Sequence, residues 1–145
     1  MTVEDNKARA RRVFEELVNT GNTAVVDEVC APGFVRHDLG GGPDVVGPEG
    51  VKLFVGALRS AFPDIQMTIE DLIGEGDSVV VRYTARGTHS GEFQGIAPTG
   101  RKVTWAGINI YRRDGDQVVE TWQLLDALGL MQQLGVVPQA GQARS

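Results

Sequence analysis

The sequence predicts an α+β fold in which three helices precede a mostly antiparallel sheet. Up to Phe62, apolar residues recur at helical spacing, and after Pro63 they alternate with polar residues, as in strands. The turn sequences "GEGD" and "RDGD" interrupt the alternating part at positions typical of hairpins. Helices that precede the strands, rather than alternate with them, indicate the α+β class.

Each of the three expected helices has an apolar face or a start signal. Residues 5–19 place apolar side chains three and four positions apart, with Glu and Arg on the other side. A short helix around residues 25–29 follows and is closed by Pro32. The third helix begins at Pro48, because proline is favoured in a first helical turn.

Four long antiparallel strands are expected after the third helix, and "ALGLMQQLG" then forms a last helix. The earlier segment "FVRHDLG" is where the first part of the chain enters the sheet. We assign residues 1–138 to one domain, since a chain of 145 residues with 41% hydrophobic content supports one core. Residues 139–145 are small, polar and terminal, and we expect them to be disordered.

Composition excludes several classes of partner. Lys and Arg number 14 against 19 Asp and Glu, a net charge of −5 that repels a phosphate backbone, so no nucleic acid is expected. No apolar run is long enough for a signal peptide or a membrane span, and we expect a cytoplasmic protein without a membrane partner. Cys30 has neither a partner for a disulfide nor a cluster of metal ligands, and we expect no metal or cofactor.

Alternation assigns the strand residues to two faces, because neighbouring side chains of a strand point in opposite directions. Tyr83 and His89 share the apolar face of their strand, and Arg82 lies on the other. The inward set of the next two strands consists of Trp105, Gly107, Asn109, Tyr111, Thr121, Gln123 and Leu125. If Gln123 points inward, Trp122 and Leu124 point outward and form a surface for a second copy of the chain.

Asn109 and Gln123 are polar residues in otherwise apolar strands. A buried amide without a partner costs about 1–3 kcal/mol, so each needs a protein group, a water or a ligand. The two side chains either pair with each other across the sheet or serve a buried site.

The stretches "THSGEFQGIAPTGRKVTW" and "RDGDQVVETWQLLDALGLMQQLG" resemble the SnoaL-like polyketide cyclase family. The resemblance implies a cone-shaped α+β barrel, as in ketosteroid isomerase and scytalone dehydratase, with a strongly curved sheet around a deep apolar pocket. Its best-known members close a ring of an aromatic polyketide by an intramolecular aldol reaction without a cofactor, and others perform hydroxylations. Members commonly dimerise through the sheet, so we expect a homodimer.

Carrying the family's site onto this sequence retains one group and replaces three. The histidine of "THSGE" is His89, whereas the acid/base aspartate of the cyclases falls on Gln123. Their strand histidine falls on Asn109 and its neighbouring glutamine on Gly107. Because an amide does not exchange protons near neutral pH, we expect pocket shape and hydrogen bonding to matter more here than one acid/base pair.

Three ionisable residues near the expected pocket mouth are candidates to replace the missing acid: His37, Asp38 and Asp126. Asp126, His37 and also His89 have structural alternatives. Asp126 precedes the last helix and is placed to cap it. His37 is equally explained as a hydrogen-bonded histidine at the solvent edge, and His89 as a residue that fixes its turn.

The candidate catalytic residues are thus His37, His89, Asn109, Gln123 and Asp126. The candidate contacts of a hydrophobic small-molecule substrate are Tyr83, Phe93, Trp105, Gly107, Tyr111 and Trp122, with core packing as the alternative for the aromatic ones. The expected function is cofactor-free ring closure, aldol or pericyclic, of a carbonyl-bearing polyketide intermediate in secondary metabolism. A non-catalytic protein that binds a small ligand, or a hydroxylase or isomerase of the same family, is the alternative.

Overall fold

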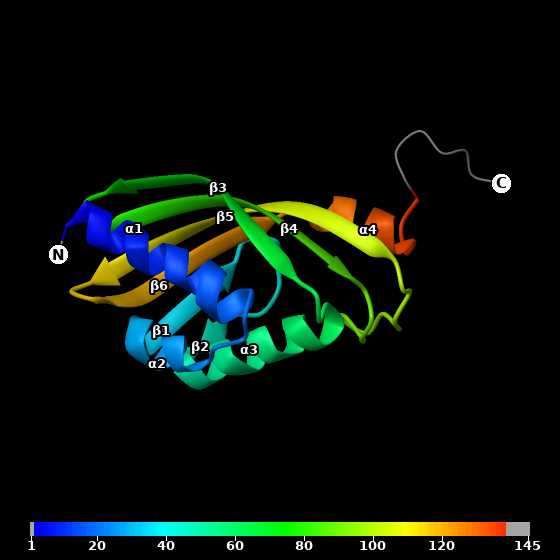
Figure 1. Cartoon of the computed structure of the whole chain (residues 1–145), viewed down its shortest axis with the longest axis horizontal. Coiled ribbons are helices and arrows are strands. Elements are labelled where there is room, and N and C mark those ends of the chain that lie inside the picture. Colours follow the sequence, from blue (N-terminus) through cyan, green and yellow to red (C-terminus); the bar gives the residue numbers. More distant parts are fainter. Residues whose placement is uncertain (1, 139–145) are drawn as a thin grey trace.

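The computed structural model describes residues 2–138, in which helices and strands follow the predicted order except for an additional short strand, Val45–Val46, before the third helix (Figure 1). The helices are α1 (Val3–Arg12), the π-helical turn η1 (Val13–Val18), α2 (Ala24–Val29), α3 (Gly47–Ala61) and α4 (Ala127–Leu134). The strands are β1 (Cys30–Asp38), β2 (Val45–Val46), β3 (Gln66–Glu75), β4 (Ser78–Thr88), β5 (Lys102–Asp114) and β6 (Gln117–Leu125). The α+β class is confirmed. The expectation for residues 139–145 lies outside the described residues.

The first predicted helix consists of α1 and η1 in one continuous run. A capping box begins it, because the Thr2 hydroxyl accepts from the Asp5 amide and the Asp5 carboxylate accepts from the Thr2 amide. The run widens at its end, where the Asn19 amide bonds to the Phe14 carbonyl, five residues back. This turn buries Phe14 with its ring 5.3 Å from the ring of Tyr83.

The sheet has the strand order β2-β1-β6-β5-β4-β3. The strands from β3 to β6 form the predicted antiparallel meander, and each of them pairs with its neighbour in sequence. β1 then pairs parallel to β6 and joins the first part of the chain to the last strand. This parallel pairing is the contact that local sequence patterns did not specify.

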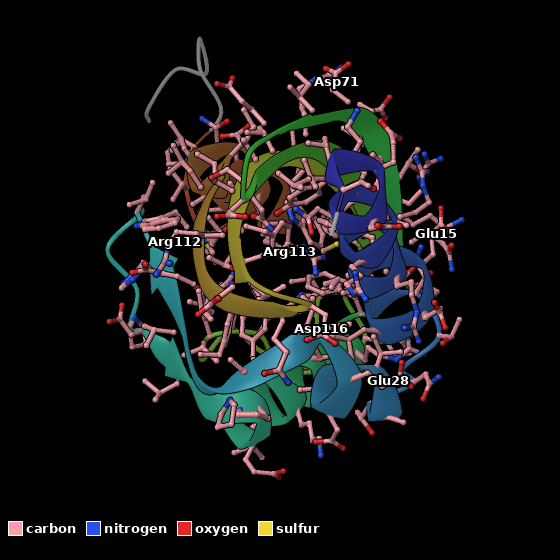
Figure 2. The ribbon with its side chains drawn as sticks, turned by 90° about the vertical axis from the view of Figure 1, so that its left-hand side faces the viewer. Glu15, Glu28, Asp71, Arg112, Arg113 and Asp116 are labelled. Atoms are coloured by element: carbon pink, nitrogen blue, oxygen red, sulfur yellow. The ribbon has the colours of Figure 1, made fainter. Side chains whose placement is uncertain are left out.

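The sheet curls so that one of its faces encloses the core, and we call this the inner face (Figure 2). α1 packs against β3 and β4, α3 packs against β1, and the long strands arch over both helices (Figure 1). Burial alternates along β4 and β5, and the exposed residues lie on the opposite, outer face. The predicted assignment of faces along these strands is confirmed.

Within residues 2–138, no helix has the length and apolar character needed to cross a membrane.

Candidate active site

Three polar residues form a row across the inner face, one on each of β1, β6 and β5. Asp38 pairs in register with Gln123, and Gln123 pairs in register with Asn109. The Gln123 side-chain amide donates a 2.8 Å hydrogen bond to Oδ1 of Asp38, and Gln123 is only 2% exposed. The row therefore brings a carboxylate next to the position where the resemblance places the acid of the cyclases.

The Asp38 carboxylate is held at one oxygen. Oδ1 accepts from Gln123 and from the backbone amide of Gly40, 2.8 Å away. Oδ2 has no hydrogen bond among residues 2–138, and a side chain at Gly42 would collide with it. The turn at residues 40–42 thus fixes the carboxylate and leaves its second oxygen without a hydrogen bond from the described residues.

Two phenols lie beside this row on β4 and β5. The Tyr111 hydroxyl accepts a 3.1 Å hydrogen bond from the Asn109 amide, which leaves its own proton free to be donated. Burial raises the pKa of Tyr83 to about 12 and raises the pKa of Tyr111 even further. Both phenols are therefore neutral hydrogen-bond donors at physiological pH. Gly107 makes room for the Tyr83 hydroxyl, with which any β-carbon at position 107 would collide.

Three oxygens of this region are buried without a hydrogen-bond partner among the described residues: Asn109 Oδ1, Thr121 Oγ1 and Gln123 Oε1. Asn109 and Gln123 do not bond to each other, because each amide nitrogen is directed to another side chain. The two residues are register partners, but the alternative in which their side chains bond to each other is wrong. Leaving each oxygen unpaired costs about 1–3 kcal/mol, which favours a ligand or water as their partner.

Arg36 lies on the same inner face, and the sequence patterns did not identify it as a site residue. It precedes Asp38 by two residues, and its guanidinium lies 4.3 Å from the centroid of the Phe54 ring on α3. Alternation from the buried Phe34 predicts this placement, because residues 34, 36 and 38 share one side of β1. Burial lowers the pKa of Arg36, and the nearby Tyr111 and Tyr83 partly counteract that effect.

His37 and Trp122 lie on the outer face and are not part of this site. They are register partners on β1 and β6, and their rings stack with centroids 5.7 Å apart. His37 Nε2 lies 2.7 Å from Glu120 Oε2, and Arg112 binds the other oxygen of Glu120. The expectation that His37 approaches the site together with Asp38 is wrong, because adjacent residues of a strand point to opposite faces.

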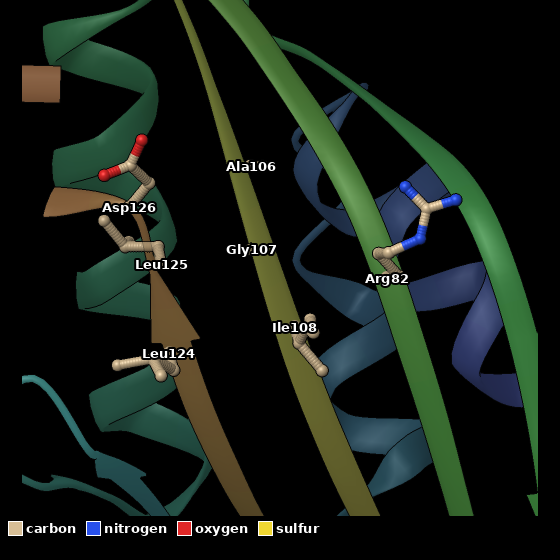
Figure 3. Close-up of a pocket in the computed structure, with 7 residues that line it drawn as sticks. All are labelled: Arg82, Ala106, Gly107, Ile108, Leu124, Leu125 and Asp126. Carbon is tan, nitrogen blue, oxygen red and sulfur yellow. The ribbon is translucent and has the colours of Figure 1, made fainter. Parts of the chain in front are cut away.

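Asp126 caps α4, as the structural alternative predicts. Its Oδ1 accepts from the Gly129 amide at 2.9 Å, in the first turn of the helix. It also borders a cavity of about 300 Å³ on the outer side of the sheet (Figure 3). The lining consists of Arg82, Ala106, Gly107, Ile108, Leu124, Leu125 and Asp126. This cavity lies away from the row of Asp38, Gln123 and Asn109.

His89, Phe93 and Trp105 gather at the other end of the inner face, around Phe62. The Phe62 ring lies 5.6 Å from His89, 5.3 Å from Phe93 and 5.2 Å from Trp105. Nδ1 of His89 accepts from the Thr99 amide at 3.2 Å, which ties down the loop after β4. From Val81, the register partner of Asn109, to His89 the strand runs eight residues, or roughly 25 Å. The structure therefore does not bring His89 together with Gln123.

Arg113 is a fully buried cation that the sequence did not single out. It lies inside the curl of the sheet, whereas Arg112 lies outside it (Figure 2). Its guanidinium donates to the Asn6 carbonyl at 3.1 Å, and burial lowers its pKa to about 10. Extending the alternation of β5 beyond Tyr111 would have placed it inward.

Among residues 2–138, no three His, Cys, Asp or Glu side chains are grouped as metal ligands.

A family model described as SnoaL-like polyketide cyclase matches residues 8–134. No match was found among the curated proteins.

Solved structures with the same fold come from several bacteria. A protein of Jannaschia sp. CCS1 assigned to the SnoaL-like polyketide cyclases is 28% identical, with a TM-score of 0.85 and coverage of 93% of this chain and 94% of its own. AclR of Streptomyces galilaeus, assigned as a hydroxylase, is 28% identical, with a TM-score of 0.84 and coverage of 97% and 87%. IdmH of Streptomyces antibioticus, assigned as a polyketide cyclase, is 31% identical, with a TM-score of 0.77 and coverage of 90% and 98%.

Proposed function

This chain belongs to the SnoaL-like polyketide cyclase family, and we propose that it closes a ring in a hydrophobic, carbonyl-bearing polyketide intermediate of secondary metabolism, without a cofactor. The observation that carries the proposal is the hydrogen bond from Gln123 to Asp38. It supports a carboxylate beside the position where the resemblance places the cyclases' acid/base group.

Asp38 is the proposed general base. Its Oδ2 removes a proton from a carbon next to a substrate carbonyl, and the resulting enolate carbon attacks a second carbonyl of the same molecule. One carbon–carbon bond forms, and the oxygen of the attacked carbonyl takes up a proton. No electron acceptor is needed, because an aldol closure of this kind is an isomerisation.

Tyr83 and Tyr111 are the proposed donors to the oxygens that become negative. Their raised pKa values support this role, since a phenol that keeps its proton donates a hydrogen bond to an enolate or alkoxide oxygen. A single donor of this type contributes roughly 2.7–4 kcal/mol to transition-state stabilisation. Asn109 holds the Tyr111 hydroxyl through its amide and so positions that donor.

The aromatic end of the inner face is suited to the apolar part of the substrate. Trp105 and Gly107 follow one another on the inner side of β5 and connect the aromatic cluster to the polar row. A folded polyketide lying along β5 would place rings against Trp105 and carbonyl groups near Tyr83 and Tyr111. Such positioning alone can supply about 7–11 kcal/mol in favourable cases.

A hydroxylase is the second candidate, supported by the likeness to AclR. A protein that only binds a small ligand is disfavoured, because a binding site for an apolar molecule does not require a carboxylate, two phenols and unpaired amide oxygens on one buried face.

The product mass separates these functions. Deleting the gene and identifying the accumulated metabolite by mass spectrometry supplies the substrate, and the purified protein is then incubated with it. Cyclisation gives a product of the same mass, or one lighter by a water if dehydration follows. A gain of one oxygen would instead establish a hydroxylase, and an unchanged but bound metabolite would establish a binding protein.

A further inference from the structure

The Arg36 guanidinium has no hydrogen bond and no ion pair with any of residues 2–138. Three arginines on the surface differ in this respect. Arg12, Arg82 and Arg112 each contact a carboxylate at the protein surface. Arg36 thus lacks the carboxylate partner that those exposed arginines have.

Removing part of the hydration shell of a cation costs free energy. Proteins generally compensate this cost with an anion or with hydrogen-bond acceptors near the cation. Desolvation is the main influence on Arg36 and lowers its pKa. Asp38 is close enough to counteract this effect weakly, yet it lies beyond ion-pairing distance and its Oδ1 is occupied by Gln123 and Gly40. The compensating group for Arg36 is therefore not supplied by the described chain.

The surroundings of Arg36 fit a planar anion. Phe54 lies against the guanidinium, and a guanidinium over an aromatic ring keeps its in-plane N–H groups for other partners. Two such N–H groups match the two oxygens of a carboxylate. Tyr83 and Tyr111 add neutral O–H donors nearby.

We propose that Arg36 binds a carboxylate of the substrate, so that the substrate class is a hydrophobic polyketide acid. This inference rests on the proposed function, since the ligand is the molecule that is cyclised. Residues 36 and 38 lie two positions apart on one side of β1, roughly 7 Å. A carboxylate bound to Arg36 would hold a carbon a few bonds away within reach of Asp38 Oδ2.

Binding of a simple aromatic acid tests the site without any need for turnover. Isothermal titration calorimetry compares naphthalenecarboxylate with its neutral carboxamide, at low ionic strength because chloride competes for a guanidinium. The wild-type protein is expected to bind the acid about tenfold or more tightly than the amide, as for a hydrogen bond to a charged group. Arg36→Met is expected to abolish this preference, because it keeps an apolar stem and removes the charge.

The matched control is Arg82→Met, on the outer face, which is expected to keep the wild-type preference. Arg36→Lys, which retains the charge but not the paired N–H groups, is expected to keep only part of it, and it carries the test if Arg36→Met does not fold. The carboxylate inference is overturned if the wild-type protein binds the acid no better than the amide, including no binding of either. It is also overturned if Arg36→Met keeps the full preference, or if Arg36→Lys keeps it in full where Arg36→Met does not fold.

The turnover assay on the accumulated metabolite decides the proposed function separately. If that metabolite is neutral and is cyclised, only the carboxylate inference fails. If the acid is bound through Arg36 but no metabolite is converted, only the cyclase function fails.

Discussion

Asp38 on β1 accepts a 2.8 Å hydrogen bond from the Gln123 amide on β6, and the two residues face each other in the parallel register of those strands. The contact joins positions 85 residues apart in the chain. The hydrogen bond places the carboxylate of Asp38 beside Gln123, whose own side chain is an amide. Several measurable consequences depend on this pair and on the surfaces around it.

Replacement of Asp38 by asparagine is expected to lower kcat by roughly 100-fold to 10,000-fold, the usual contribution of a general base. The amide preserves the size of the side chain but does not remove a proton. Steady-state kinetics on the accumulated metabolite measures the loss. Glu120→Gln, on the outer face, is the control and is expected to retain the wild-type kcat. A loss of less than about tenfold in Asp38→Asn would assign the base elsewhere.

Moving the carboxylate across the pair, in the double variant Asp38→Asn/Gln123→Asp, is expected to recover part of the lost rate. The amide and the acid exchange places within hydrogen-bonding distance, so the site keeps one carboxylate and one amide. The measurement is kcat of the double variant against Asp38→Asn alone. If the double variant is no faster, the position on β1 itself is required, and the pair is not interchangeable.

Gly107→Ala is expected to reduce the rate more than Asn109→Leu does. The added methyl group collides with the Tyr83 hydroxyl and displaces a donor and its ring together, whereas Asn109→Leu removes one hydrogen bond. Overpacking of this kind also lowers the free energy of unfolding by about 1–3 kcal/mol. Gly56→Ala on α3 is the control, because nothing lies near its added methyl group, and thermal unfolding should show it unchanged or more stable. Equal kinetic effects of the two strand substitutions would contradict the role given to Tyr83.

The ion pair of His37 and Glu120 predicts a specific pH dependence of stability. The hydrogen bond to Glu120, with nearby Asp44, raises the pKa of His37, and Arg112 and His37 lower the pKa of Glu120. The contribution of His37 to the free energy of unfolding is complete below its ordinary pKa of 6.5 and is lost as pH rises through its raised pKa in the folded state. The contribution of Glu120 is complete above its ordinary pKa of 4.5 and is lost as pH falls through its lowered pKa in the folded state.

Urea unfolding at about pH 5.5 and about pH 8.5 checks this dependence. His37→Gln is expected to lower the free energy of unfolding more at the lower pH, where the wild-type pair is charged in the folded state. Ser90→Gln, at an exposed position remote from Glu120, is the control. An equal effect of His37→Gln at both values would show that the imidazole contributes only its packing on Trp122.

We propose that the outer face of the sheet joins two copies of the chain. Leu124 is 52% exposed and Ile108 is 47% exposed, and the two are register partners on β6 and β5. Sedimentation velocity at micromolar concentration is expected to show twice the mass of 15.6 kDa, and Leu124→Asp is expected to yield the single chain. Leu53→Asp on α3, at a position that is 76% exposed, is the control and should remain paired. A wild-type species of 15.6 kDa would exclude this interface.

Much of the fold and part of the candidate site could be predicted from the sequence. The change of hydrophobic period after Pro63 gave the order of helices and strands, because period is a local property of the chain. The same alternation placed Asn109 and Gln123 on the buried face and Leu124 on the exposed one. It would also have separated His37 from Asp38 if it had been applied to β1.

The sequence by itself determined which residues face inward along β4, β5 and β6 and where the helices start, as Asp126 at the beginning of α4 illustrates. Only the tertiary structure decided that β1 lies parallel to β6, and therefore that Asp38 meets Gln123 and Arg36 lies near Tyr83 and Tyr111. The physical reason is that side-chain direction follows from the backbone of one strand, whereas the choice of neighbouring strand depends on packing of the whole sheet around the core.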